Sequence, residues 1–141
     1  MERDTGRLSA LFRFPIKSLS AEPLDTVLLD PDRPLPSDRR FAFAEADSDA
    51  GCETWLPKRH ILQLARFPTL AEVTARVDLD ARKLQLFHRA QGKIAARLDA
   101  VEDRTALADW IARVLDRPAG SLHFVEAAPY SHTDQEPGSC H

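Results

Sequence analysis

The sequence predicts a mostly β fold, a small antiparallel or mixed β-barrel with one α-helix in its C-terminal half. Three observations favour this class. Apolar and polar residues alternate along several short segments, which is typical of half-buried strands. Short polar turns join consecutive segments, as in an antiparallel meander. One later segment instead spaces its apolar residues at the helical period. With 141 residues, 43% of them hydrophobic, the chain is long enough to bury one core.

Three strands are expected in the first third of the chain. The first covers residues 8–14, whose Leu and Phe side chains share one face until Pro15 ends the strand. A second short strand covers residues 24–29. A third covers residues 40–46, where two phenylalanines alternate with small alanines. Three prolines within residues 30–37 predict an irregular loop, because proline cannot donate a backbone hydrogen bond.

Residues 70–98 carry the clearest strand pattern. In the strand predicted at 70–77, small and β-branched side chains are expected to face the core: Ala71, Val73, Ala75 and Val77. Turns at 80–83 and 90–93 lead into strands at 84–88 and 94–98, which predicts a meander. The preceding segment, 60–67, fits a helical turn as well as a strand, so both interpretations stay open.

One helix is predicted from Asp103 onward. Its apolar residues fall at helical spacing: Leu107, Trp110, Ile111, Val114 and Leu115. Asp103 is the expected N-cap, and Pro118 lies just beyond the end. A short strand follows at 122–126. We therefore expect a domain over residues 1–128, followed by a flexible tail or linker at 129–141, where little can be buried.

Charge and composition exclude several classes of partner. The 19 basic and 22 acidic residues give a net charge of −3, so we expect no nucleic-acid partner. No apolar run is long enough to span a membrane, and the first residues lack the apolar core of a secretory signal. Two cysteines are too few for a disulfide framework, so a cytoplasmic location is expected.

Two basic segments are candidates for binding an anion. Lys17 and Ser18 follow the first predicted strand, where an ammonium group beside a hydroxyl suits a phosphate or another oxyanion. Arg39 and Arg40 open the third strand, and their side chains must point to opposite sides. One of them can enter a pocket, with Asp38 orienting it. Taken singly, each segment is more often a solvated lysine or a surface ion pair.

The remaining polar residues give no catalytic or metal site. The five histidines lack metal-ligand spacing, so no metal is expected. Cys52 follows a glycine in a turn, but no basic residue directly flanks it to activate its thiol, and Cys140 lies close to the end of the sequence. We predict no catalytic residue in this chain. A free-standing enzyme that uses the Cys52 thiol remains an alternative.

The order of these motifs resembles the N-terminal β-barrel domain of the MOSC family, proteins related to the C-terminal region of molybdenum cofactor sulfurase. The resemblance rests on Phe-Pro-Ile-Lys-Ser at 14–18 and Ser-Asp-Arg-Arg-Phe at 37–41, with Phe-Pro-Thr-Leu at 67–70 matching more loosely. Residues 130–134 resemble the linker toward a MOSC core. In cofactor-holding members, such as amidoxime-reducing enzymes, the matching residues contact the cofactor's phosphate or pterin. The resemblance thus implies that Lys17, Ser18 and Arg39 bind the molybdenum cofactor (molybdopterin).

Two functions from different classes follow. The first is an anion-binding wall for the molybdenum cofactor that is not catalytic by itself, because the core that carries catalysis and sulfur transfer in the family lies outside the resemblance. The alternative is a protein-interaction module that pairs with a separate MOSC core or a partner enzyme. It predicts an exposed apolar patch near the helix or the tail.

Overall fold

Seven strands and one α-helix make up the regular structure of the computed structural model, which describes residues 5–32, 35–36, 38–46 and 60–126. The strands are β1 (Leu11–Arg13), β2 (Glu22–Leu24), β3 (Phe41–Glu45), β4 (Thr74–Asp78), β5 (Lys83–His88), β6 (Gly92–Arg97) and β7 (Leu122–Glu126). The helix is α1 (Val101–Val114), and a short 3-10 helix, η2 (Pro68–Glu72), precedes β4. The predicted fold class, mostly β with one helix in the C-terminal half, is confirmed.

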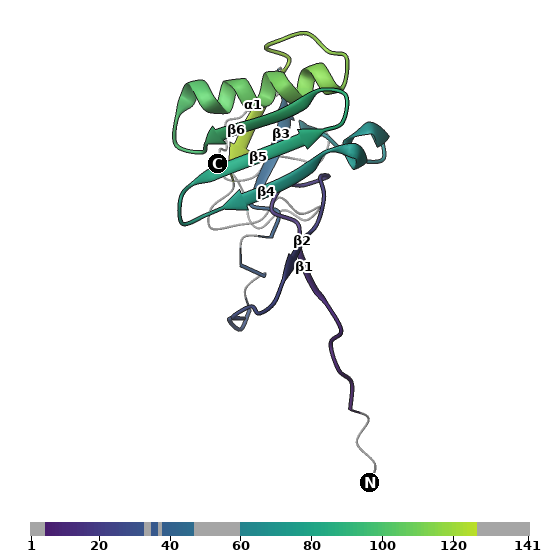
Figure 1. The fold of residues 1–141 in the computed structure, drawn as a ribbon, viewed down its shortest axis with the longest axis vertical. Coiled ribbons are helices and arrows are strands. Elements are labelled where there is room, and N and C mark those ends of the chain that lie inside the picture. Colours follow the sequence, from purple (N-terminus) through teal and green to yellow (C-terminus); the bar gives the residue numbers. More distant parts are fainter. Residues whose placement is uncertain (1–4, 33–34, 37, 47–59, 127–141) are drawn as a thin grey trace.

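The described strands pair in three antiparallel sheets. Strands β4, β5 and β6 form the predicted meander, whereas β3 pairs with β7 and β1 with β2. Figure 1 shows α1 along the β6 side of the meander, β3 behind it, and the β1–β2 pair projecting toward the N-terminus. Two single bridges tie other segments to β3, one parallel at Ile16 and one antiparallel at Ile61. The ladders of the described residues do not by themselves close a ring.

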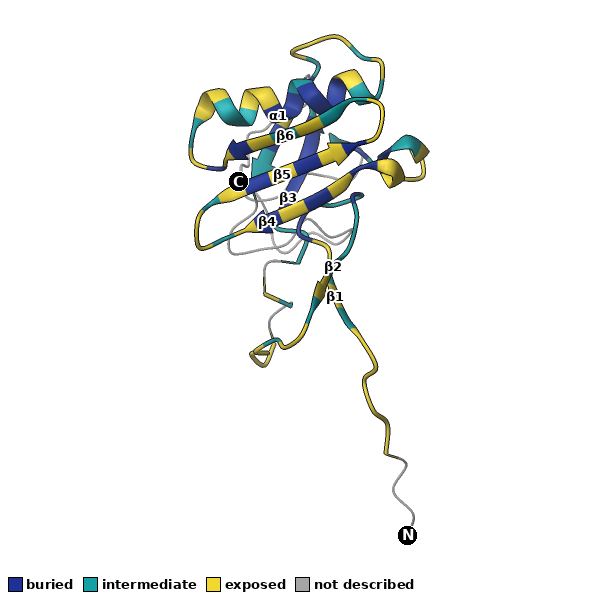
Figure 2. Cartoon of the chain, viewed as in Figure 1, coloured by how far each residue is buried: buried dark blue, intermediate teal, exposed yellow. Residues whose placement is uncertain are grey.

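Strand β3 is the centre of the fold. One edge pairs with β7. On the other edge, Phe41 donates to the Pro15 carbonyl (3.0 Å) and accepts from the Lys17 amide (2.9 Å), and the Phe43 carbonyl accepts from the Leu62 amide (2.8 Å). The four residues from Phe41 onward are all buried, on both faces of the strand (Figure 2). A strand covered on both faces and at both edges is fixed in its register.

The core lies between β3, the meander and α1. Val73, Ala75 and Val77 are buried, as the alternating pattern predicts, and they belong to one apolar cluster with Trp110 and Ile111 of the helix. The helix packs against β6 and β7. At roughly 1.5–3 kcal/mol for each large apolar side chain buried, this cluster is the main source of stability.

The start of the helix differs from the prediction. It begins at Val101, Ala100 is its N-cap, and no side chain caps it. Asp103 lies in the first turn instead, and its Oδ2 accepts from the backbone amide of Arg97 (2.7 Å). Asp103 therefore joins the helix to β6 rather than capping it, while its charge still suits the positive end of the helix dipole.

The helix ends before Pro118, as expected, but an aspartate takes the left-handed position that follows its C-cap. Asp116 adopts a left-handed backbone, with φ of 57°. Its amide bonds to the Arg113 carbonyl (3.1 Å), and the Arg117 amide bonds to the Ala112 carbonyl (2.8 Å). These two bonds are those of a Schellman cap, in which glycine is the usual left-handed residue. Pro118 follows immediately and prevents the helix from continuing.

Two predicted strands are shorter or displaced. The strand expected at 8–14 is reduced to β1, and the strand expected at 24–29 is replaced by β2, which ends where the prediction begins. Leu8 and Phe12 are 78% and 55% exposed. The only ladder partner of β1 is the three-residue β2, whose Pro23 cannot donate a hydrogen bond. An apolar stripe without a covering element does not produce a buried strand.

Two further segments depart from the pattern. The strand expected from residue 70 begins at Thr74, because Pro68 starts the 3-10 helix, and Ala71 is exposed rather than buried. In the ambiguous segment 60–67, Ile61 forms a single bridge to β3 and Phe67 bonds back to the Gln63 carbonyl (3.0 Å). That segment is therefore neither a regular strand nor a regular helix. The predicted tail at 129–141 lies outside the described residues.

Candidate functional site

The three residues predicted to bind an anion line one surface pocket. This pocket has a volume of about 380 Å³, and its lining comes from three segments: Phe14, Lys17, Ser18 and Leu19, then Arg39, then Gln63, Leu64 and Ala65. The segments meet because residues 15–17 pair through their backbone with Phe41, the first residue of β3. The Arg39 amide bonds to the Phe14 carbonyl, which places the two sequence motifs side by side.

Arg39 is held in the pocket wall by its neighbours. Its Nη1 donates to Oδ2 of Asp38 (2.6 Å), and its guanidinium lies over the Phe14 ring, 5.5 Å from the centroid. The other carboxylate oxygen of Asp38 accepts from the Phe14 amide (2.8 Å). Asp38 therefore orients Arg39 and fixes it to the first motif. The Arg39 side chain is still 41% exposed, so an anion in solution can reach it.

Arg39 and Arg40 serve different sites, as predicted, but both precede β3, so strand alternation is not the reason. Arg39 lines the pocket, whereas Nε of Arg40 donates to Oε2 of Glu126 (2.8 Å). The backbone of Arg39 is left-handed, with φ of 49°. A non-glycine residue in this conformation costs about 1 kcal/mol, which the surrounding hydrogen bonds offset.

The Ser18 hydroxyl has two partners in the pocket wall. Its Oγ donates to the Leu62 carbonyl (3.0 Å) and accepts from the Leu64 amide (3.2 Å). Its backbone is also left-handed, with φ of 72°. The hydroxyl thus ties residues 62–64 to the first motif and builds the third wall of the pocket. Binding of the cofactor by Ser18 stays a prediction.

Two cationic side chains line the pocket. They are Lys17 and Arg39, and among the described residues the carboxylate of Asp38 pairs with Arg39. The Lys17 amide bonds to β3, so its backbone position is fixed. Two cations around a small cavity, one of them a planar guanidinium next to an aromatic ring, can bind an oxyanion.

In the described part of the chain, the His, Cys, Asp and Glu residues form no group of three or more that could hold a metal ion. His88, the one buried polar residue found there, contacts Glu72 through Nε2 (3.3 Å), and its Nδ1 accepts from two backbone amides. No described helix is long and apolar enough to cross a membrane. Cys52 and Cys140 lie outside the described residues.

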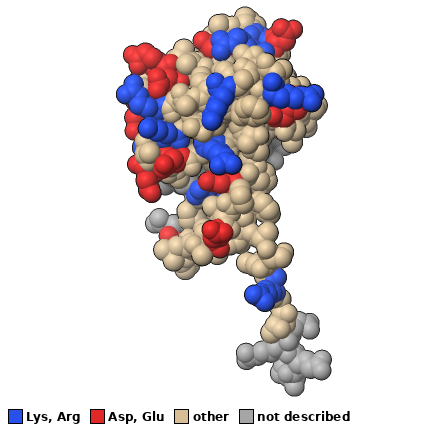
Figure 3. Space-filling view, viewed as in Figure 1, with Lys and Arg blue, Asp and Glu red and all other residues tan. Residues whose placement is uncertain are grey.

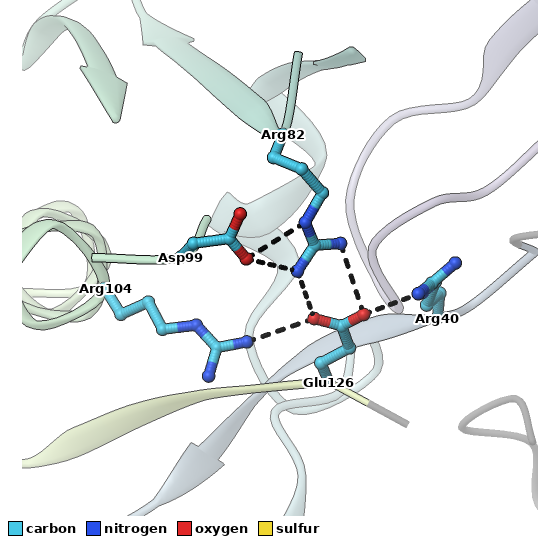
Figure 4. A network of polar contacts seen from close by, with 5 residues as sticks. All are labelled: Arg40, Arg82, Asp99, Arg104 and Glu126. Carbon is cyan, nitrogen blue, oxygen red and sulfur yellow. Dashed lines mark hydrogen bonds and ion pairs between the residues drawn. The ribbon is translucent and has the colours of Figure 1, made fainter. Parts of the chain in front are cut away.

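A second polar cluster, which the sequence did not reveal, surrounds Glu126 at the end of β7 (Figure 4). The carboxylate of Glu126 accepts hydrogen bonds from Arg40 (2.8 Å), from Arg82 (2.9 and 3.3 Å) and from Arg104 (3.2 Å). Arg82 also donates to Asp99 (2.9 and 3.1 Å). We call these five residues the Glu126 cluster. They come from five segments of the chain, so no local spacing could have predicted the cluster.

The Glu126 cluster shifts the titration of its members. Burial acts to raise the pKa of the Glu126 carboxyl, but hydrogen bonds and charge from Arg82 and Arg40 outweigh it, so that pKa lies below its ordinary value of 4.5. The hydrogen bond from Arg82 lowers the pKa of Asp99. The bonds to Glu126 and Asp99 raise the pKa of Arg82. Glu126, Asp99 and Arg82 are therefore charged at neutral pH. The hydrogen bonds of the cluster tie β3, the meander, α1 and β7 together.

Together, the fold and the pocket define a small, mostly β domain with a basic surface site where two N-terminal motifs meet. Residues 5–118 match the family model of the MOSC N-terminal beta barrel domain, and the chain belongs to that family. Neither the curated proteins nor the solved structures contain a match to this chain. The family match ends four residues before β7, although β7 completes the pairing of β3.

Proposed function

We propose that this chain forms an anion-binding wall of a molybdenum-cofactor site and is not catalytic by itself. The observation that carries the proposal is that Lys17 and Arg39, which lie in separate sequence motifs, line one pocket. Family membership supports the cofactor as the source of the anion, because MOSC proteins are generally linked to it. The cytoplasmic location expected from the sequence remains part of this proposal.

The chemistry of the lining fits the anionic part of the cofactor. An ammonium and a guanidinium are phosphate-binding groups, and the Phe14 ring offers an apolar face next to them. Among the described lining residues there is no thiolate or imidazole, so these residues fit a phosphate rather than the metal. The cofactor would supply the redox chemistry, and this chain would hold and orient its phosphate.

Titration with inorganic phosphate, followed by amide NMR, tests this proposal. We expect the amides of Lys17 and Arg39 to shift first. The variant Lys17→Ala should weaken binding about tenfold, because a hydrogen bond to a charged group contributes roughly 1.5–3 kcal/mol. Arg39→Gly should act similarly, and glycine accepts the left-handed backbone without strain.

A matched control is Lys93→Ala, which removes an exposed lysine from β6 without touching the pocket. It should leave phosphate binding unchanged. If about 10 mM phosphate, far above the dissociation constant expected of a built site, moves no pocket amide, the proposal is wrong.

The alternative function, pairing with a separate MOSC core or a partner enzyme, has one observation in its favour. Large exposed apolar side chains gather in the N-terminal part of the chain: Leu8, Phe12, Phe14, Leu28 and Leu29. The sequence predicted such a patch near the helix or the tail; among the described residues Val101 of α1 is exposed, and the tail lies outside them. Replacing Phe12 with Ser should abolish complex formation with an added MOSC core if this function is correct.

A further inference from the structure

The meander has an open edge at β4. Strand β5 occupies one side of β4, and no strand of the described residues pairs with the other. A groove of about 550 Å³ runs from this edge over the neighbouring part of β5, and residues 21–23, residues 74–78, Lys83 and Gln85 line it. An edge strand presents unpaired backbone groups, and proteins commonly protect such edges from pairing with another chain.

The hydrogen bonds show which backbone groups point outward. The Ala75 amide donates to Oγ of Ser20 (2.9 Å), so the backbone groups of Ala75 face away from β5. Because backbone direction alternates along a strand, those of Val77 face outward too, whereas those of Arg76 face β5. Ser20 therefore protects one amide at the start of the edge and leaves the groups of Val77 for a partner.

The side chains along this edge match a second copy of the same strand. In an antiparallel pair centred on Val77, Arg76 of one copy lies opposite Asp78 of the other, and the reverse pair occurs by symmetry. Both side chains are exposed on the outer face of β4. Residues 76 and 78 form non-hydrogen-bonded pairs in this register, which is where cross-strand side chains approach most closely.

The backbone fits the same register. The two Val77 residues exchange two hydrogen bonds. The next outward groups, the Ala75 amide and the Leu79 carbonyl, are already bonded to Ser20 and to the Arg82 amide (3.3 Å). The ladder between the two copies is therefore limited to the residues around Val77.

The opposite edge of the meander does not offer this match. On β6 the Arg97 amide bonds to Asp103, so the outward groups are those of the odd-numbered residues. An antiparallel pair centred on Ala95 would place Lys93 opposite Arg97 of the other copy, and like charges repel. Figure 3 shows both signs of charge interspersed over the face that holds the meander.

We propose that β4 is a homodimerisation edge, at which two copies of this chain join their meanders into one six-stranded sheet centred on Val77. Five-residue strands bury less area than a stable interface needs, so the dimer is weak and forms at high protein concentration.

Sedimentation equilibrium of the full chain, from about 20 μM to about 1 mM, tests the proposal. Wild type should self-associate over this range. Arg76→Asp places like charges opposite each other twice and should weaken association about tenfold. Arg89→Asp carries the same change of charge at an exposed position of the β5–β6 turn, away from the β4 edge, and should leave association unchanged.

A mixture of two charge variants gives the decisive test of the proposed pairing. Asp78→Arg alone should also weaken self-association, although it removes the hydrogen bond from the Ala81 amide to Asp78 as well. An equimolar mixture of Arg76→Asp with Asp78→Arg restores opposite charges at both positions, so a mixed dimer should form. Thermal unfolding confirms that each variant folds.

Three results would overturn the proposal. The first is a wild-type chain that stays monomeric at every concentration, which would leave the edge to a strand of a different protein. The second is a mixture of the two variants that forms no mixed dimer. The third is an Arg89→Asp control that weakens association as much as Arg76→Asp.

Discussion

Arg40 and Glu126 lie 86 positions apart in the sequence and form an ion pair, with Nε of the arginine 2.8 Å from Oε2 of the glutamate. The pair sits where β3 begins and β7 ends, because Phe41 lies opposite Glu126 in that ladder. Arg82 and Arg104 converge on the same carboxylate. The carboxylate of Glu126 thus accepts hydrogen bonds from three arginines in other parts of the fold, so its removal should affect all three.

We expect Glu126→Gln to lower the free energy of unfolding by about 2 kcal/mol, because a neutral amide with one accepting oxygen replaces the carboxylate that three partly buried guanidinium groups share. Urea unfolding at neutral pH measures the change. The matched control is Asp99→Asn, which should have a smaller effect, since that side chain is 67% exposed. Equal losses for the two variants would contradict the central role of Glu126.

Stability should fall in acid for the same reason. The pKa of Glu126 is lower in the folded protein than its ordinary value of 4.5, so its contribution is present above pH 4.5 and is lost as the pH falls through the folded value. Asp103, whose pKa is lowered by the hydrogen bond from the Arg97 amide, acts in the same direction. Unfolding measured between about pH 7 and pH 3 should show a flatter dependence for Glu126→Gln than for wild type.

Ser18 offers a test of the pocket wall. Ser18→Ala removes the hydrogen bonds to Leu62 and Leu64 while keeping a side chain on a left-handed backbone, and it should destabilise the fold by about 1–2 kcal/mol. Ser18→Gly loses the same bonds but relieves the backbone, so it should be less harmful than alanine. Thermal unfolding compares the two. If the glycine variant is the less stable one, the left-handed backbone is not a source of strain.

His88 stabilises the turn between β5 and β6. Its Nδ1 accepts from the amides of Ala90 (3.3 Å) and Gln91 (3.2 Å), so the ring holds the proton on Nε2, which faces Glu72. His88→Ala should cost about 2 kcal/mol and speed amide exchange in the turn. His88→Asn can present an oxygen near the Nδ1 position and should recover part of the loss. No recovery would mean that packing of the ring, rather than its acceptor, is what matters.

Local patterns were enough to predict the meander and the helix. Residues 84–88 and 94–98 alternate cleanly and are joined by short turns, so both strands appear within two residues of their predicted bounds. The strand at 122–126 was predicted at its observed bounds. Where one face is buried and the next partner is near in sequence, period and turn chemistry determine the structure.

Local sequence patterns could not predict how distant segments pair. Alternation in residues 8–14 and 24–29 predicts strands, but tertiary contacts decide whether a covering element exists, and here Phe12 stays exposed. The Glu126 cluster is invisible to spacing, because its members come from five segments. The pocket was anticipated only through the order of two motifs, and the structural role of the Ser18 hydroxyl depends on Leu62, which no motif includes.

The double-sided pairing of β3 has a consequence for how the domain can be shortened. A chain cut at residue 118, where the family match ends, would lack β7 and would expose the hydrogen-bonding row of a strand made of Phe and Ala. It would also leave Arg40, Arg82 and Arg104 without the carboxylate of Glu126. Such a fragment should aggregate rather than fold, and a ribosome must release β7 before the centre of the protein can close.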